Sequence, residues 1–141
     1  LGVLQLKYID KSIQKRKKIV EYYRQHLRGL PGIYFFEDIP EVRHNYPYFP
    51  IFIDRELFGK SREEVYDALK RQNIFPRRYF YPLISQFPAY KGLESAQPSN
   101  LPVAEKATQK VLCLPIYPEL KESEVTRIVN IIRGREKNAN Q

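Results

Sequence analysis

The stretch "RRYFYPLISQFPAY", residues 77–90, places two arginines directly before a run of aromatic side chains. An arginine guanidinium is a planar fork of donors that suits phosphate oxygens, and a tyrosine offers a flat ring together with a hydroxyl group. Arg77, Arg78, Tyr79 and Tyr81 therefore have the chemistry to hold a sugar linked to a nucleotide diphosphate. The composition leaves a second interpretation open, an edge strand with its aromatic side chains in the core and its arginines in solvent.

A second aromatic stretch, "HNYPYFPIFI" at residues 44–53, repeats this pattern. Asn45, Tyr46 and Tyr48 all stand beside or near prolines, and we expect Asn45 and Tyr46 to belong to the same substrate-binding surface. An edge strand rich in aromatic residues explains the stretch equally well, because Pro47 and Pro50 each remove a donor from a strand ladder.

No other set of residues predicts catalysis or metal binding. Cys113, the single cysteine, lies in the apolar stretch "VLCLP" and is expected to be a buried structural thiol, which suits the reducing cytoplasm. His26 and His44 are far apart and have no ligand partners at metal-binding spacing. Glu63 and Glu64 are interpreted as carboxylates that favour a helix N-terminus. Phosphate-binding glycine loops and GxSxG elbows do not occur.

The chain is basic, with a net charge of +8 from 24 Lys and Arg against 16 Asp and Glu. Arginine beside aromatic residues is also the combination that single-stranded nucleic acids bind, so a basic nucleic-acid-binding α/β domain is the alternative function. The densest basic run, "KSIQKRKK" at residues 11–18, is explained equally by the solvated face of a helix. No apolar run approaches the ~20 residues of a membrane span, so no membrane partner is expected.

The hydrophobic pattern predicts an α+β fold, in which helices pack on one side of a small, largely antiparallel sheet. A long amphipathic helix is expected first, and part of its apolar face should meet another body. A long connection over residues 83–101 joins the later elements. The expected helices are 3–28, 61–73, 102–110 and 123–134, and the expected strands are 33–36, 46–54, 74–81 and 111–117.

The chain is expected to be a piece of a longer protein. It contains no methionine and opens on "LGVLQLKYI", which has the character of a helix interior. We expect three parts, namely a connecting helix over 1–28, a small domain over 29–135 and a disordered tail over 136–141.

The order of four stretches resembles the C-terminal part of the DegT/StrS-type sugar aminotransferases, which use pyridoxal phosphate and have the aspartate aminotransferase fold type. No single motif is decisive, but the order and spacing of the four are specific, and they run almost from end to end. The stretches are "LGVLQLKYIDKSIQKRKKIVEYYRQHL", "NYPYFPIFI", "SREEVYDALKRQNIFPRRYFYPLISQFPAY" and "LPVAEKATQKVLCLPIYPELKESEVTRIVNII".

The resemblance implies transfer of an amino group, usually from glutamate, to a keto-sugar carried on a nucleotide, by a cytoplasmic homodimer. The run "RRYFYP" is similar to that of family members acting on dTDP-linked 3- or 4-keto-6-deoxyhexoses. The family's Schiff-base lysine and most cofactor contacts belong to a large N-terminal domain, which is expected to be absent here. No lysine of this chain matches that motif, so no catalytic or cofactor-binding residue is carried over, and the fragment is expected to be inactive alone.

By the same likeness, Arg78, Tyr79 and Tyr81 line the mouth of the active site in the whole enzyme, and neither nucleic acid nor membrane is a partner. A paralogue that keeps this fold without the lysine stays open, since the diagnostic region lies outside the sequence.

Overall fold

The computed structural model describes residues 2–135, and the predicted disordered tail at 136–141 lies outside this range. Four strands form one antiparallel sheet in the order β1-β2-β4-β3. The strands are β1 (Ile33–Phe35), β2 (Phe49–Ile53), β3 (Arg77–Arg78) and β4 (Val111–Leu114). The strand β4 lies in the interior of the sheet and all four of its residues are buried, as its wholly apolar sequence predicts.

Helices supply the rest of the core, which they form with one face of the sheet. The buried residues of β2 alternate along the strand, and its core-facing side chains meet those of α2, α4 and α6. This arrangement confirms the predicted α+β fold. The helices are α1 (Gly2–Leu6), α2 (Ile9–Leu27), α3 (Arg55–Phe58), α4 (Arg62–Arg71), α5 (Pro102–Lys110) and α6 (Glu122–Arg133).

Helices α4 and α6 begin and end as their sequences predict. Ser61 and Glu64 form a reciprocal capping box, in which Glu64 N–H donates to Ser61 Oγ at 3.2 Å and Ser61 N–H donates to Glu64 Oε2 at 2.7 Å. Gly134 ends α6 with a φ of 73°, the left-handed conformation that glycine adopts without strain.

The first helix is interrupted, whereas the sequence predicted one continuous helix over 3–28. Lys7 and Tyr8 form a turn between α1 and α2, in which Tyr8 N–H donates to the Gln5 carbonyl at 3.0 Å. The apolar residues of α1 are largely exposed, with Val3 exposed by 78% and Leu6 by 68%. Local propensity alone does not hold so short a helix straight, because tertiary packing normally supplies that stability.

The segment between β1 and α4 also differs from the prediction. The expected strand over 46–54 begins only at Phe49, because Tyr46 has a φ of 48° that no strand contains. Pro50 lies in the first half of β2, one residue beyond the last pairing with β1, so only β4 pairs with the strand there. The expected edge position of this proline is therefore confirmed locally, although β2 as a whole lies between β1 and β4. The sequence also missed α3, which begins after Asp54, whose carboxylate accepts from Glu56 N–H at 3.1 Å.

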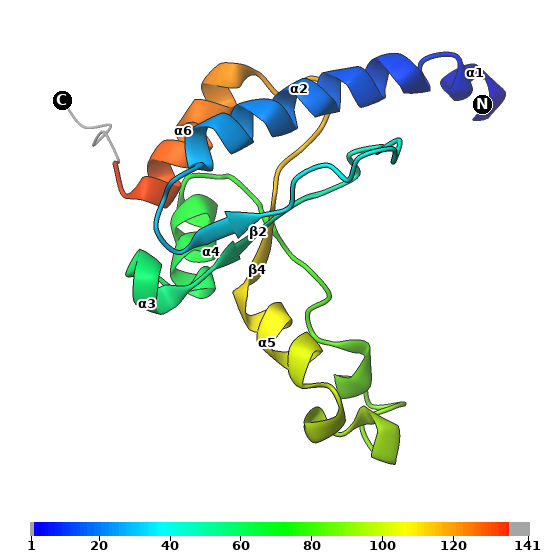
Figure 1. Ribbon diagram of the computed structural model, residues 1–141, viewed down its shortest axis with the longest axis vertical. Coiled ribbons are helices and arrows are strands. Elements are labelled where there is room, and N and C mark those ends of the chain that lie inside the picture. Colours follow the sequence, from blue (N-terminus) through cyan, green and yellow to red (C-terminus); the bar gives the residue numbers. More distant parts are fainter. Residues whose placement is uncertain (1, 136–141) are drawn as a thin grey trace.

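The segment between β3 and α5 projects with α5 away from the sheet and the other helices (Figure 1). It contains three single turns of 3₁₀ helix at Ile84–Gln86, Glu94–Ala96 and Pro98–Asn100. Two contacts tie it to α5, since Thr108 Oγ1 donates to the Phe80 carbonyl at 3.2 Å and the Gln86 amide donates to the Glu105 carboxylate. Within residues 2–135, no helix combines the length and the apolar character that a membrane span requires.

Candidate functional site

A pocket of about 300 Å³ opens where β3 runs into the projecting segment. Three of the predicted substrate-binding residues, Arg78, Tyr79 and Tyr81, lie in its wall, whereas Asn45 and Tyr46 do not. We call it the β3 pocket, and its lining residues are Tyr48, Arg77, Arg78, Tyr79, Phe80, Tyr81, Pro82, Ile84 and Phe87.

Arg78 is held on the side of the sheet that carries the helices. Its partner on β4 is Leu112, which is a core residue, and its guanidinium lies 4.0 Å from the ring centre of Tyr66 on α4. The Nε atom of Arg78 donates to Glu63 Oε2 at 3.0 Å, and Nη2 donates to the same oxygen. The hydrogen bond to Glu63 raises the pKa of Arg78, so the guanidinium stays protonated. The same hydrogen bond fixes the orientation of the Arg78 side chain.

Glu63 also pairs with a second arginine, Arg62, which is 5% exposed. Arg62 Nη1 donates to the carbonyl of Thr108 on α5 at 2.9 Å, which satisfies part of this buried charge. The ring of Tyr81 lies close to both guanidinium groups, 4.9 Å from that of Arg62 and 5.3 Å from that of Arg78. Cation–π attraction therefore helps to fix the orientation of Tyr81 at the rim of the pocket.

Arg77 belongs to the opposite side of the sheet, because successive strand residues point to opposite faces. Its guanidinium lies 5.8 Å from the ring centre of Tyr48, and that ring lies 5.4 Å from the ring of Tyr79. A regular strand would add Tyr81 to this group, but Phe80 has a φ of 48° that ends the alternation. The pocket therefore has two walls, with Arg77, Tyr48 and Tyr79 on one and Arg78 and Tyr81 on the other.

Asn45 and Tyr46 lie instead beside α2. The ring of Tyr46 is only 5% exposed and packs in the core, and its hydroxyl donates to the carboxylate of Asp38. Burial and Asp38 together raise the pKa of Tyr46 to about 12. Asn45 is exposed, and its carbonyl accepts from Arg16 Nη2 at 2.8 Å. The role predicted for these two residues in substrate binding stays a prediction.

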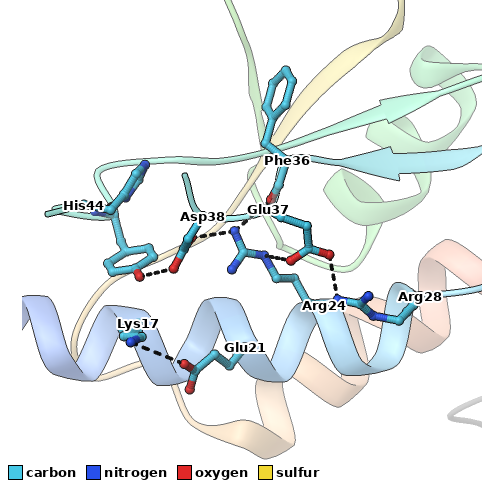
Figure 2. A network of polar contacts seen from close by, with 9 residues as sticks. Lys17, Glu21, Arg24, Arg28, Phe36, Glu37, Asp38 and His44 are labelled. Carbon is cyan, nitrogen blue, oxygen red and sulfur yellow. Dashed lines mark hydrogen bonds and ion pairs between the residues drawn. The ribbon is translucent and has the colours of Figure 1, made fainter. Parts of the chain in front are cut away.

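A polar network fastens this segment to α2, as Figure 2 shows for Arg24 and Arg28 of the helix and Glu37 and Asp38 above it. Arg24 Nη2 donates to Asp38 Oδ1 at 2.8 Å, and Arg28 Nη2 donates to Glu37 Oε1 at 2.6 Å. The hydrogen bond from Arg24 lowers the pKa of Asp38. The network thus fixes the backbone that leads to Asn45.

We expect Asp38→Asn to lower the free energy of unfolding by about 1 kcal/mol at pH 7 and to weaken its dependence on acid pH. The folded-state pKa of Asp38 is below the unfolded value of about 3.9. Its contribution is therefore complete above the unfolded pKa and is lost as the pH falls through the lower, folded-state pKa. Urea denaturation at pH 7, 4 and 3 measures the effect. Asp67→Asn, an exposed change on α4, should keep the wild-type dependence. An identical pH dependence in Asp38→Asn would contradict the assignment.

Sequence reasoning missed three residues that shape the β3 pocket, namely Glu63, Arg62 and Tyr66. Glu63 was interpreted only as a carboxylate at a helix N-terminus, whereas it forms ion pairs with Arg62 and Arg78. One signal was available, because residues three or four positions apart share a helix face and place Tyr66 beside both Glu63 and Arg62.

The remaining reactive groups are structural in character. Cys113 is 3% exposed, which confirms the expected buried thiol, and burial raises its pKa to about 11. Across the part of the chain that the structure describes, no group of three or more His, Cys, Asp or Glu side chains is arranged to hold a metal ion.

Comparisons with known proteins agree on one family. The chain is 49% identical over 134 residues to dTDP-4-amino-4,6-dideoxy-D-glucose transaminase of Escherichia coli, covering 95% of this chain and 36% of that protein. It is 39% identical over 132 residues to the Shigella dysenteriae protein of the same name, covering 94% of this chain and 35% of that protein. The crystal structure of DesI with its TDP-sugar product superposes with a TM-score of 0.85 at 26% identity, over 94% of this chain and 33% of DesI.

The chain therefore spans about a third of the length of these relatives. The model of the family matches residues 1–133, which is nearly the whole sequence. The chain belongs to the DegT/DnrJ/EryC1/StrS aminotransferase family.

Proposed function

We propose that this chain is the C-terminal part of an aminotransferase that transfers an amino group from glutamate to a keto-sugar carried on dTDP. The β3 pocket is the observation that carries the proposal, because it gathers two arginines and three tyrosines at one opening. Arginine suits the diphosphate and tyrosine suits the base and the sugar. Two relatives named as dTDP-4-amino-4,6-dideoxy-D-glucose transaminases favour a 4-keto over a 3-keto substrate.

In this proposal residues 1–28 connect to a large domain, and residues 29–135 form the small domain. The exposed apolar residues of α1, Val3 and Leu6 among them, suit a helix that packs on another body. The active enzyme is a cytoplasmic homodimer, and this chain alone is inactive.

Pyridoxal phosphate, when bound, would accept the amino group from the donor and pass it to the keto-sugar. The lining of the β3 pocket includes no lysine among residues 2–135, so this wall does not offer the group to which the cofactor binds covalently. We assign that lysine to the large domain. The residues of this chain have the task of binding and orienting the sugar nucleotide.

Arg78, Tyr79 and Tyr81 border the substrate in this proposal, and Asn45 reaches it from the segment before β2, outside the β3 pocket. Tyr46 keeps its ring in the core, so its part is to hold Asn45 in place through the bond to Asp38.

The test uses the full-length protein with pyridoxal phosphate, glutamate and dTDP-4-keto-6-deoxyglucose. We expect the absorbance band of protein-bound cofactor, release of 2-oxoglutarate and an amino-sugar product by mass spectrometry. The 141-residue chain, assayed in parallel, should give neither the band nor the product. A full-length protein that holds no cofactor, or that binds a mixed-sequence oligonucleotide with steep salt dependence, would overturn the proposal.

A further inference from the structure

Arg77 and Arg78 are neighbours in sequence, but the sheet separates them. On β4 their partners are Cys113 for Arg77 and Leu112 for Arg78. Leu112 belongs to the core under the helices, so Arg78 faces α4 and Arg77 faces the other side of the sheet. Both side chains reach the β3 pocket, and a ligand there would meet them from two walls.

The charge of Arg78 is already compensated. Its Nε and Nη2 atoms both donate to Glu63, which also pairs with Arg62. An anion that approached Arg78 would have to displace this carboxylate or lie beside it, and the carboxylate would repel it. A second cation behind this wall, Arg62, does not line the pocket, is buried and donates to a backbone carbonyl. This wall is therefore built to orient the ring of Tyr81 more than to attract an anion.

Arg77 is in the opposite situation. Among residues 2–135, its side chain is exposed and has neither an ion pair nor a side-chain hydrogen bond. Its guanidinium lies against Tyr48, whose ring contacts Tyr79, so two flat faces lie next to an uncompensated cation. A guanidinium of this kind can present two parallel donors to phosphate oxygens, while the rings pack against a base or a sugar.

We propose that Arg77 is the residue that contacts the diphosphate of the sugar nucleotide, and that Tyr48 and Tyr79 form the adjoining surface for its uncharged part. Arg78 is a positioning residue, fixed by Glu63, that orients Tyr81. This inference rests on the proposed function. It adds that Arg77, and not Arg78, meets the diphosphate, and that Tyr48 belongs to the contact surface.

The experiment measures competitive inhibition of the full-length enzyme by dTDP and, separately, by thymidine, which has the same base and no phosphate. In Arg77→Gln we expect the inhibition constant of dTDP to rise about 10- to 100-fold, the range for loss of a charged hydrogen-bond partner. The constant for thymidine should change less than about threefold, because the rings are intact. Arg77→Lys should recover part of the affinity for dTDP, since it restores the charge without the paired donors.

Two further variants separate a specific contact from the general effect of charge. Arg71→Gln removes one exposed positive charge from α4 outside the pocket and should leave both inhibition constants within about twofold of wild type. Arg78→Gln removes a charge from the same strand and should raise the inhibition constant of dTDP less than Arg77→Gln does, because Glu63 already compensates the charge of Arg78. A larger loss of dTDP affinity in Arg78→Gln than in Arg77→Gln would overturn the inference, as would equal losses of dTDP and thymidine affinity in Arg77→Gln.

The outcomes also distinguish this inference from the proposed function. An enzyme that aminates the sugar nucleotide but whose Arg77→Gln variant keeps its dTDP affinity supports the function and refutes the role of Arg77. For a protein without that activity, calorimetry with dTDP supplies the result. If the wild-type protein binds dTDP and Arg77→Gln does not, the contact between Arg77 and the diphosphate is supported, without support for the proposed activity. If the wild-type protein does not bind dTDP, this contact is refuted.

Discussion

Tyr23→Ala is expected to lower the free energy of unfolding by about 3–5 kcal/mol, the usual cost of removing a large buried aromatic ring. Tyr23 on α2 has no exposed surface, and its ring stacks on Phe49 of β2 with 5.1 Å between ring centres. Its hydroxyl donates to the Pro115 carbonyl at 3.0 Å, and burial raises the pKa of this hydroxyl far above its usual range. One side chain thus joins α2 to the sheet and to the segment after β4.

Urea denaturation followed by circular dichroism measures this loss for the 141-residue chain. Tyr23→Phe is the matched variant, because it keeps the ring and removes only the bond to Pro115. We expect it to cost about 1–2 kcal/mol. If Tyr23→Ala unfolds the chain outright, the Phe variant still gives a measurable value. A loss below about 1.5 kcal/mol in the Ala variant would show that this ring does not hold α2 on the sheet.

A methyl group at Gly32 is expected to cost about 2–5 kcal/mol, as the sum of a left-handed backbone conformation and overpacking. Gly32 has a φ of 77°, and a Cβ atom there would lie 2.5 Å from the Phe58 backbone nitrogen and 2.8 Å from the Asp54 carbonyl oxygen. These are backbone atoms that cannot move as a side chain does. The Gly32 carbonyl also accepts from Asp54 N–H at 2.8 Å, so any shift disturbs the end of β2.

Gly29→Ala is the matched control for Gly32→Ala. Gly29 has the same φ of 77°, but a Cβ atom added there would have nothing within 4 Å. This variant should lose only the conformational part, about 1–2 kcal/mol. The difference between the two midpoints of urea denaturation therefore isolates the close approach of α3 to β1. Equal losses at the two positions would contradict that packing.

The comparison of these residues with the sequence shows what local information can predict. Val125, Ile128, Val129 and Ile132 recur at helical spacing and are all buried, with exposures of 0–2%. The caps of α4 depend on residues three positions apart, and β4 is apolar throughout. These features arise within one turn or one strand, so the local sequence is enough to predict them. The order and spacing of four such stretches were also enough to show a resemblance to a known family.

The site divides along the same line. The sequence by itself determined that Arg77, Arg78, Tyr79 and Tyr81 lie together, because they are neighbours in the chain. Strand alternation also places Arg77 and Arg78 on opposite faces. The tertiary structure alone decided which arginine is compensated, since Glu63 reaches Arg78 across 15 positions and the pairing of β3 with β4 sets which face carries the helices. It also decided that Tyr46 lies in the core and that a turn at Lys7 and Tyr8 interrupts the expected first helix. Such outcomes depend on partners distant in sequence, or on the lack of a partner, and the spacing of residues along one segment does not contain that information.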